Sequence, residues 1–469
     1  MLAAGEGKRM RSGRAKVLHR LAGRPLVAYP LVLARALGAS GTVVVVGYQG
    51  DAVREALGAT GPGGDLRFVE QKEQRGTGHA LTMAKGAVPG DATELLLLYA
   101  DVPLLSVATV ERGLAEHRRT RAAATVLTFT PDDPTGYGRI VRRGGRRGPV
   151  VGIVEERDTT PVQRRLRECN SGIYVFDPRW LWPALDRLSP QNDQGEFYLT
   201  DVIGLLARGG RRVAAVHVDD PLEVAGVNDR RQLAALEAVL GARILGRLME
   251  DGVTVLDPAA TYVDADVAVG RDTVLYPGVR LESGTVIGEG CVIGTGCQLA
   301  RATLGDGVTL KAYCVVEDAV VEVEATVGPF ARLRPRSVVR AGAKIGNFAE
   351  INRSTIGRGA KVPHVSYVGD ATVGEGANVG AGTITCNYDG VAKHETHIGA
   401  RAFIGTNSSL VAPLQIGEDA YVGAGSVITK DVPPGALAVE RADQVVKEGW
   451  TERRRRRQAG GETRPAKAD

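Results

Sequence analysis

The chain has 469 residues, of which 43% are apolar and 24% charged, with five cysteines and a formal net charge of +5. This length and apolar content predict two or more globular domains whose cores need neither metal nor disulfides. The cysteines are scattered, odd in number and without a CxxC pair, which argues against a structural zinc site and a disulfide framework and favours a reducing cytoplasm. We expect no signal peptide, and the longest apolar runs are too short to span a bilayer.

The chain opens with MLAAGEGKRM, a glycine-rich loop of the kind that cradles phosphate. Such a loop normally follows a β-strand, and only Met1 precedes this one. A central parallel strand is buried on both faces, and each of its lost aliphatic side chains would cost about 1.5 to 3 kcal/mol. We therefore expect that the first strand is missing here and that the natural product begins further upstream.

Residues 1–228 predict an α/β domain. The runs GTVVVVGY, ELLLLYADVPLL and AAATVLTF are typical of strands, and they alternate with PLVAYPLVLARALGA and VATVERGLAEHRR, which have helical period. This pattern indicates a Rossmann-like, nucleotide-handling domain with a mixed, mostly parallel sheet. Residues 229–250 begin with an aspartate cap and predict a connecting helix.

A repeat begins after residue 250. An aliphatic residue followed by glycine recurs at intervals of six, or of eighteen, which equals three hexapeptides. This is the signature of a left-handed parallel β-helix, in which each aliphatic side chain stacks on its counterpart one coil away. We predict such a helix over residues 251–441, with an outward loop at the polar stretch CNYDGVAKHET, where a site is expected. The repeated positions include Ile287, Ile293, Val373, Val379, Ile398, Ile404, Ile416 and Val422.

The positive charge is concentrated in the C-terminal segment, 442–469. Residues 452–469 carry four of the five net positive charges, including the arginine run 453–457. Beside Gly, Pro and Ala, such a run is typical of a solvated, disordered tail. We expect no specific nucleic-acid partner, with contact to RNA or an acidic surface as a minor alternative.

Asp101 is the first candidate for chemistry. It follows a leucine run and so lies at the carboxyl end of a predicted parallel strand, where open α/β sheets bind ligands. A carboxylate there suits Mg²⁺, although an aspartate after a strand can also simply cap the next turn. Arg9 and Lys16 could bring positive charge to phosphates, or they could be ordinary surface residues at the start of a helix.

Several motifs resemble one family in order along the chain: LAAGEGKRM, EQRGTGHA, YADVPL, DDPTGYGRI, GIVEE, CNSGIYVF, GEFYLTD, GVNDR, GPFARLRP, VGAGTITCNYDG and KEGW. The family is the bifunctional bacterial N-acetylglucosamine-1-phosphate uridylyltransferase and glucosamine-1-phosphate N-acetyltransferase. The resemblance runs from Leu2 to about Trp450 and leaves out only the arginine-rich tail. It implies a nucleotidyltransferase domain followed by an acetyltransferase β-helix.

For the first domain the resemblance implies uridylyl transfer from UTP to N-acetylglucosamine-1-phosphate, with release of pyrophosphate. It assigns Arg9 and Lys16 to catalysis, and Asp101 and Asn228 to Mg²⁺. Ala100 stands where the family usually has glycine, which puts the close backbone approach there in doubt. The nucleotide and sugar contacts that it implies are Leu2, Ala3, Ala4, Gly5, Lys16, Gln71, Gly76, Thr77, Tyr99, Ala100, Asp101, Gly138, Glu155, Asn170 and Asn228.

For the second domain the resemblance implies acetyl transfer from acetyl-CoA to glucosamine-1-phosphate. The attacking amine must lose a proton, and histidine is the usual base near neutral pH. The resemblance assigns this role to His364, while the residues alone leave His394 and His397 as alternatives. The sugar-phosphate contacts that it implies are Arg334, Asn352, Tyr367, Asn378 and Lys393, and the acetyl-CoA contacts are Ala381, Asn387, Tyr388, Thr406, Ala424 and Arg441.

Two positions in the second domain depart from the family pattern. Asn352 stands where the family commonly has lysine, and Arg353 follows it. One phosphate cation is therefore lost or has moved by one residue. Because neighbouring residues of a strand point to opposite faces, Arg353 is not an obvious substitute, and we expect weaker binding of the sugar phosphate rather than lost chemistry. Thr406 replaces a serine but keeps the hydroxyl group.

The resemblance further implies a homotrimer that forms through the β-helix and makes UDP-N-acetylglucosamine in the cytoplasm, for cell-wall and envelope polymers. Three alternatives stay open. The chain could be a sugar nucleotidylyltransferase with a regulatory β-helix, or an acetyltransferase alone if the first strand is missing. It could also be a non-catalytic scaffold subunit, against which the intact Arg9, Lys16 and Asp101 argue.

Overall fold

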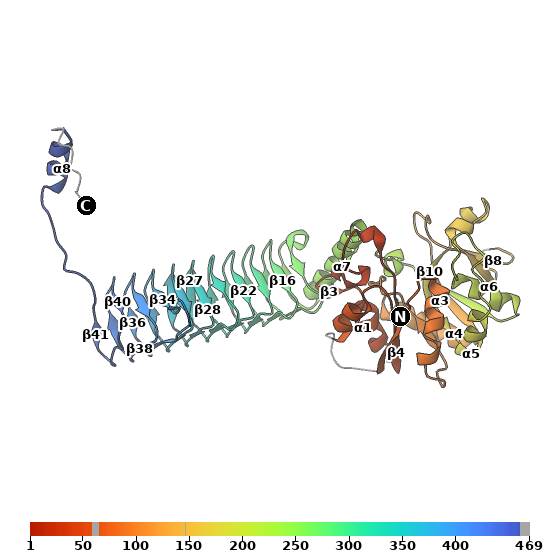
Figure 1. Cartoon of the computed structure of the whole chain (residues 1–469), viewed down its shortest axis with the longest axis horizontal. Helices are drawn as coiled ribbons and strands as arrows, with labels where there is room; N and C mark the ends of the chain where they lie inside the picture. The colour runs from red at the N-terminus through yellow and green to blue at the C-terminus, as the bar shows by residue number, and fades with distance from the viewer. Residues whose placement is uncertain (59–64, 146, 460–469) are drawn as a thin grey trace. The chain divides into compact units, whose positions relative to one another are not determined.

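The computed structural model describes residues 1–58, 65–145 and 147–459. Its contacts divide into two compact units, which Figure 1 colours from red to green and from green to blue. Within the described ranges, no helix is long and apolar enough to cross a membrane. The first unit comprises Met1–Asp251, Tyr262–Val267 and Leu281–Ser283, and the second comprises Gly252–Thr261, Ala268–Arg280 and the chain from Gly284 onward.

The first unit is an α/β domain with two sheets and a small hairpin. One sheet contains β1 (Leu2–Ala3), β4 (Gly41–Val46) and β5 (Asp65–Glu70), all parallel, in the order β1-β4-β5. The other contains β6 (Leu95–Leu97), β7 (Ala124–Phe129), β8 (Arg139–Arg142), β9 (Val150–Val154), β10 (Cys169–Phe176) and β11 (Val213–His217). It is mixed, because β11 runs parallel to β7 while β10 runs antiparallel to both β6 and β7. The hairpin is β2 (Arg20–Leu21) with β3 (Arg24–Pro25), and two further short strands are β13 (Tyr262–Val263) and β16 (Arg280–Glu282).

The three helices predicted from periodicity are present as α1, α4 and α7, and polar caps explain the starts of the last two. Ser106 accepts a hydrogen bond from the Thr109 N–H at the beginning of α4, and Asp229 accepts two at the beginning of α7. The helix predicted after residue 228 is therefore present. The helices are α1 (Ala28–Ala36), α2 (Gly50–Gly58), α3 (Thr77–Met83), α4 (Val107–Thr120), α5 (Pro178–Leu185), α6 (Thr200–Arg208) and α7 (Arg230–Glu250).

The first strand is not wholly missing, because Leu2 and Ala3 form the two-residue strand β1 beside β4. The Leu2 N–H donates to Leu98 O at 2.9 Å and Leu2 O accepts from Ala100 N–H at 3.0 Å, while Val45 N–H donates to Met1 O at 2.9 Å. Both neighbours of the strand are thus engaged, and Leu2 and Ala3 are only 7% and 3% exposed. The short strand is held because it pairs with β4 on one side and Leu2 bridges to Tyr99 on the other.

A cavity of about 570 Å³ lies beside Met1. Residues 41–43 of β4 and 95–97 of β6 contribute to its lining, so it lies where a backward extension of β1 would run.

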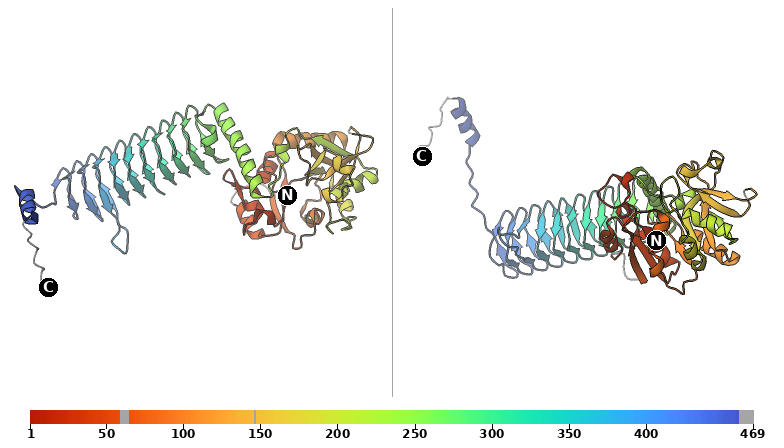
Figure 2. Two further views of the ribbon diagram at one scale, coloured as in Figure 1. Left: turned by 90° about the horizontal axis from the view of Figure 1, so that it is seen from above. Right: turned by 45° about the vertical axis from the view of Figure 1, so that its right-hand side comes forward.

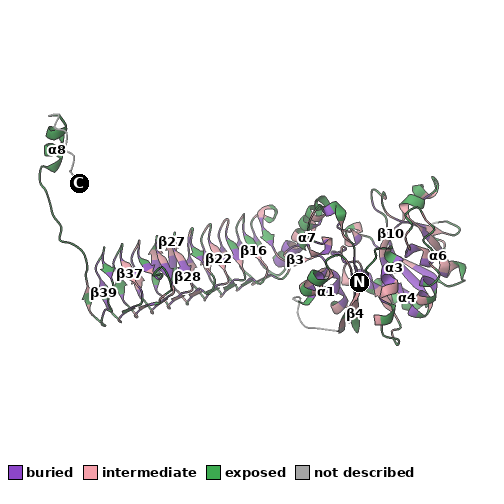
Figure 3. Ribbon diagram, in the orientation of Figure 1, coloured by how far each residue is buried: buried purple, intermediate pink, exposed green. Residues whose placement is uncertain are grey.

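The second unit is a parallel β-solenoid with three sheets, visible as the stack of coils in Figure 1. The hexapeptide ladder is confirmed: Val327, Ile345 and Val362 lie in register in successive coils and are at most 1% exposed. Figure 3 shows this buried interior along the solenoid. The stacking explains the period, because one coil places equivalent residues 17 or 18 positions apart.

We name the three sheets the first, second and third faces. The first face contains β12 (Thr254–Val255), β15 (Val274–Leu275), β18 (Val292–Ile293), β21 (Thr309–Leu310), β24 (Thr326–Val327), β27 (Lys344–Asn347), β30 (Lys361–His364), β33 (Asn378–Val379), β36 (Phe403–Ile404), β39 (Tyr421–Val422) and β41 (Leu437–Ala438). The second face includes β19 (Gln298–Ala300), β22 (Val315–Glu317), β25 (Arg332–Leu333), β28 (Glu350–Asn352), β31 (Tyr367–Gly369), β34 (Ile384–Cys386), β37 (Ser409–Val411) and β40 (Val427–Ile428). The third face contains β14 (Ala268–Val269), β17 (Val286–Ile287), β20 (Thr303–Leu304), β23 (Val320–Val321), β26 (Val338–Val339), β29 (Thr355–Ile356), β32 (Ala371–Val373), β35 (Thr396–Ile398) and β38 (Leu414–Ile416).

Two segments depart from the coil. The predicted polar loop is present between β34 and β35 and projects from the solenoid in Figure 2. The arginine run, predicted to be disordered, instead lies in helix α8 (Trp450–Ala459). Arginine is a good helix former, and neither glycine nor proline occurs within this stretch. Residues 460–469 lie outside the described residues.

Candidate functional site

The first unit places the glycine-rich loop directly after β1. Gly7 has φ +72°, and a Cβ there would lie 2.4 Å from the Lys16 Cβ, so only glycine lets the loop pass Lys16 this closely. Gln74 Nε2 donates to Ala4 O at 2.9 Å and ties the loop to the segment before α3. Arg9 is exposed in the short 3-10 helix that follows, Lys8–Met10.

Lys16, Asp101 and Asn228 come together although they are far apart in the sequence. Lys16 Nζ donates to Asp101 Oδ2 at 2.5 Å and to Asn228 Oδ1 at 3.2 Å. The Lys16 and Asp101 side chains are only 12% and 18% exposed. Two oxygens thus converge on one positive charge, which is the arrangement that a hard divalent cation requires of its ligands.

The backbone fixes this pair of oxygens. Asp101 follows β6 at the end of the sheet, and its carbonyl accepts the Val227 N–H at 2.8 Å, which holds the Asn228 segment beside it. The residues present therefore fit a metal ion whose shell is completed by phosphate and water. Here the Lys16 ammonium occupies that position.

Three residues expected around the sugar also lie together. The Gly138 carbonyl accepts the Asn170 N–H at 2.8 Å, and a Cβ on Gly138 would lie 3.5 Å from Glu155 Oε2. The Thr200 hydroxyl donates to Glu155 Oε1 at 2.9 Å. Burial raises the pKa of Glu155 above its usual range. A carboxyl group in this place can accept hydrogen bonds from the hydroxyl groups of a sugar.

The remaining nucleotide candidates frame the start of α3. Gln71 is buried and donates through Nε2 to Gly76 O at 3.2 Å, while Gly76 has φ +100° immediately before Thr77 opens the helix. A Cβ on Gly76 would meet Phe197 O at 2.7 Å, so this turn requires glycine. Ala100 is buried, and burial raises the pKa of its neighbour Tyr99.

In the second unit, one row of residues follows the turn from the first face to the second face, which we name the first corner. Lys344, Lys361, Asn378, Phe403 and Tyr421 are in register in consecutive coils, so the residues three positions later are equivalent as well. Two of the backbone bonds between these turns are from Asn407 N–H to Ala381 O at 2.7 Å and from Gly425 N–H to Thr406 O at 2.8 Å. The row comprises Asn347, His364, Ala381, Thr406 and Ala424.

His364 is exposed at this corner, and its Nδ1 is hydrogen-bonded to Asn347 Oδ1 one coil away. An amide oxygen only accepts, so Nδ1 carries the hydrogen in this contact, and Nε2 is the nitrogen that holds the lone pair of the neutral ring. A neutral imidazole that is held in this way can take a proton.

The alternative histidines have other surroundings. His394 Nε2 lies 2.7 Å from Asp389 Oδ2 within the projecting loop. Donors from the loop backbone and His394 hold the pKa of Asp389 well below its usual range, so Asp389 is an anion that keeps His394 engaged. His397 lies in β35 on the third face, beside Glu395. The geometry therefore favours His364 as the base.

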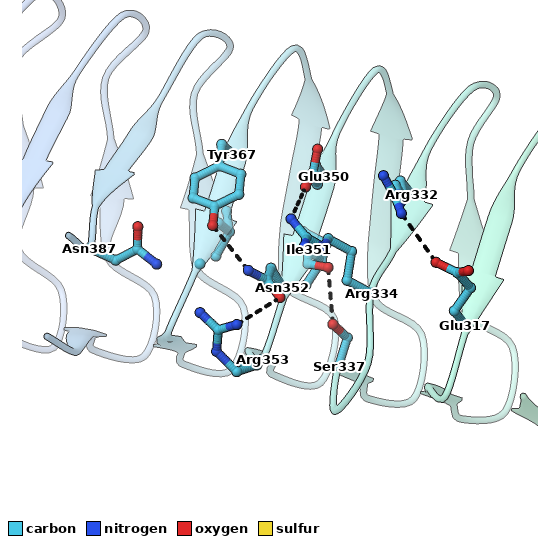
Figure 4. A network of polar contacts seen from close by, with 12 residues as sticks. Glu317, Arg332, Arg334, Ser337, Glu350, Ile351, Asn352, Arg353, Tyr367 and Asn387 are labelled. Carbon is cyan, nitrogen blue, oxygen red and sulfur yellow. Dashed lines mark hydrogen bonds and ion pairs between the residues drawn. The ribbon is translucent and has the colours of Figure 1, made fainter. Parts of the chain in front are cut away.

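Polar side chains also gather at the turn from the second face to the third face, which we name the second corner (Figure 4). Asn352 is 4% exposed and donates through Nδ2 to the Tyr367 hydroxyl at 3.1 Å. Tyr367 folds back over Gly369, where a Cβ would lie 2.5 Å from its hydroxyl oxygen. Asn387 Nδ2 donates to Asp370 Oδ2 at 2.5 Å.

The argument from strand alternation against Arg353 is wrong. Strand β28 ends at Asn352, and Arg353 lies beyond it at the corner with φ +48°. Because the chain turns there, the Arg353 side chain lies on the same side as Asn352, with Nη1 3.5 Å from Asn352 Oδ1.

The other predicted contacts are distributed along the coils. Arg334 follows β25 and donates to Glu350 Oε1 at 2.9 Å, and Lys393 is exposed in the projecting loop together with Tyr388. Arg441 donates to Ala424 O at 2.7 Å and so joins the first-corner row. Asn378 begins β33 on the first face, and the structure does not bring it to the sugar-phosphate candidates of the second face.

The sequence analysis did not find three residues that hydrogen-bond to the predicted site residues. Thr200 bonds to Glu155, Asn347 bonds to His364, and Asp370 bonds to Asn387. For the last two, a signal was available, because each partner lies 17 residues away, which is one coil of the repeat. Nothing local in the sequence points to Thr200.

Comparisons with known proteins agree with this layout. Residues 1–255 match the MobA-like NTP transferase domain family, residues 259–340 match the GMPPB C-terminal domain, and residues 395–430 match the bacterial transferase hexapeptide with six repeats. The chain is 45% identical over 460 residues to a bifunctional protein GlmU of Koribacter versatilis, covering 98% of this chain and 97% of that protein. It is 46% identical over 455 residues to that of Trichlorobacter lovleyi, with 97% and 98% covered, and 46% identical over 467 residues to that of Geobacter metallireducens, with 96% and 97% covered.

Proposed function

The chain belongs to the family of bifunctional GlmU proteins, and we propose that it makes UDP-N-acetylglucosamine by two reactions in two separate sites. The solenoid transfers acetyl from acetyl-CoA to glucosamine-1-phosphate, and the α/β unit transfers uridylyl from UTP to the product. The observation that carries this proposal is that each unit assembles its own cluster of residues suited to its reaction, around Asp101 in one unit and His364 in the other.

Acetyl transfer needs a base, an anchor for the sugar phosphate and a groove for the thioester. His364 Nε2 takes the proton of the attacking amine, and Asn347 keeps the imidazole in the required tautomer. The first-corner row extends from His364 through Ala381, Thr406 and Ala424 and suits an extended acyl carrier. Asn378 is apart from the other sugar-phosphate candidates within one chain, which supports a homotrimer whose sites combine two subunits.

Uridylyl transfer requires that two anions approach each other. The loop N–H groups after β1 hold phosphate oxygens, and Lys16 gives up Asp101 and Asn228 to pair with phosphate instead. Asp101 and Asn228 would then hold Mg²⁺, which when bound neutralises the phosphates and the leaving pyrophosphate. We place the protein in the cytoplasm, where UTP and acetyl-CoA are available.

Two variants assayed for both activities test the proposal. H364A should abolish acetyl transfer and spare uridylyl transfer, while D101N should do the reverse. Acetyl transfer is followed by CoA thiol release, and uridylyl transfer by pyrophosphate release from UTP with Mg²⁺. Loss of both activities in either variant would contradict two independent sites. If the unmodified chain transfers acetyl but not uridylyl groups, the result would support the alternative that the protein is an acetyltransferase only.

A further inference from the structure

Arg353 is a cation next to the expected sugar-phosphate contacts, yet nothing assigns it a role. Its Nη1 lies 3.5 Å from the Oδ1 of Asn352, whose Nδ2 contacts the Tyr367 hydroxyl at 3.1 Å. Figure 4 shows the guanidinium directed to this pair. Asn352 itself is neutral, and Arg334 is already bonded to Glu350. Arg353 therefore places a positive charge beside Asn352.

The guanidinium of Arg353 is held in one orientation by Asp370. Nε donates to Oδ1 at 2.6 Å and Nη2 donates to Oδ2 at 2.7 Å, so the carboxylate grips one edge of the planar group. Asn387 donates to the same carboxylate at 2.5 Å. The pKa of Asp370 is lowered, chiefly by Arg353, so it stays ionised. Asp370 thus engages Nε and Nη2, and the third guanidinium nitrogen, Nη1, points to Asn352.

We propose that Arg353 binds the phosphate of glucosamine-1-phosphate through Nη1 and that Asp370 positions it. The inference rests on the proposed acetyl transfer. A phosphate placed against Asn352 and Tyr367 meets a fixed N–H donor with a full charge, which is the stronger class of hydrogen bond. Arg353 thus supplies the positive charge expected at position 352, because the chain turns at the corner and brings its side chain beside Asn352.

A purely structural role is the competing explanation, since the same corner carries a similar pair elsewhere. Arg301 donates through Nε and Nη2 to Asp318, one coil on, at 2.5 and 2.7 Å. The Arg301 and Asp318 side chains are 59% and 38% exposed, whereas those of Arg353 and Asp370 are 21% and 14% exposed. Arg301 therefore provides a matched control outside the site.

The test is steady-state acetyl transfer by the full chain in three variants, R353N, R353N/D370N and R301N. We expect R353N to raise the KM for glucosamine-1-phosphate about tenfold to a hundredfold, the effect of losing one charged hydrogen bond. The kcat and uridylyl transfer should not change, and thermal midpoints should confirm that the variants fold. R301N should leave every kinetic constant at the value of the unmodified chain.

The double variant separates the two explanations. If Arg353 supplies charge, R353N/D370N keeps the high KM, because the carboxylate is removed but the cation is still missing. If Arg353 only neutralises Asp370, the double variant returns to the KM of the unmodified chain, and the inference is overturned. An unchanged KM in R353N, or an equal rise in R301N, overturns it as well. Absence of acetyl transfer in the unmodified chain would instead contradict the proposed function.

Discussion

Lys16 and a divalent cation compete for the same two oxygens, and K16M should expose this competition. In the structure, Lys16 Nζ lies 2.5 Å from Asp101 Oδ2 and 3.2 Å from Asn228 Oδ1. A cation that binds there must first break this pair, which is mostly shielded from water. A hydrogen bond between charged groups is worth about 1.5 to 3 kcal/mol. Its removal should therefore tighten metal binding about tenfold to a hundredfold, at about 1.4 kcal/mol per factor of ten.

The assay is titration of the full chain with Mn²⁺ in the absence of nucleotide, with free ion followed by electron paramagnetic resonance. K8M is the control of matched charge, because Lys8 is 82% exposed and contacts only Glu6, at 3.4 Å, among its ion pairs in the described chain. Its affinity for Mn²⁺ should equal that of the unmodified chain. The reasoning fails if K16M binds Mn²⁺ no more tightly than the unmodified chain does.

Three other outcomes follow from single contacts. N347A should lower the kcat of acetyl transfer about tenfold, which is part of the 10² to 10⁴ that a positioned base supplies, because His364 loses the acceptor that fixes its tautomer. A kcat equal to that of the unmodified chain would exclude this role. G369A should raise the KM for glucosamine-1-phosphate about fivefold, the worth of one neutral hydrogen bond of about 1 kcal/mol, since the new Cβ would displace the Tyr367 hydroxyl. In a preparation whose chain starts at Met1, burial lowers the pKa of the Met1 amine from 8.0 to about 5, so the unfolded chain binds more protons between these values and stability falls by up to about 4 kcal/mol as pH drops from 8 to 5. Urea unfolding at several pH values should show this slope, and N-terminal acetylation should remove it; equal slopes with and without acetylation would refute the assignment.

The elements that the sequence predicted share one physical basis, a local period or a local cap. The solenoid follows from aliphatic residues that stack one coil apart, as Val327 and Ile345 do, and α7 follows from the Asp229 cap. The arginine run was predicted to be disordered but lies in a helix, because charge and composition were weighed there above the helix propensity of arginine.

The sequence also grouped the candidate residues by motif, but motifs carry no distances. That Lys16 rests on Asp101 and Asn228, 85 and 212 residues away, depends on how the sheet brings three loops to one edge. Likewise, β1 could not be foreseen, because two residues form a strand only when neighbours on both sides already offer hydrogen-bond partners.

The sequence by itself determined the two-part architecture, the family and the residue types that each reaction needs, since these depend on periodicity and on order along the chain. The tertiary structure alone decided which groups meet. The corner after Asn352 turns Arg353 back toward the sugar-phosphate contacts, and one coil of the solenoid brings Asn347 to His364. Contacts of this kind arise from register between coils and from the left-handed turn of a corner residue, which no run of neighbouring residues specifies.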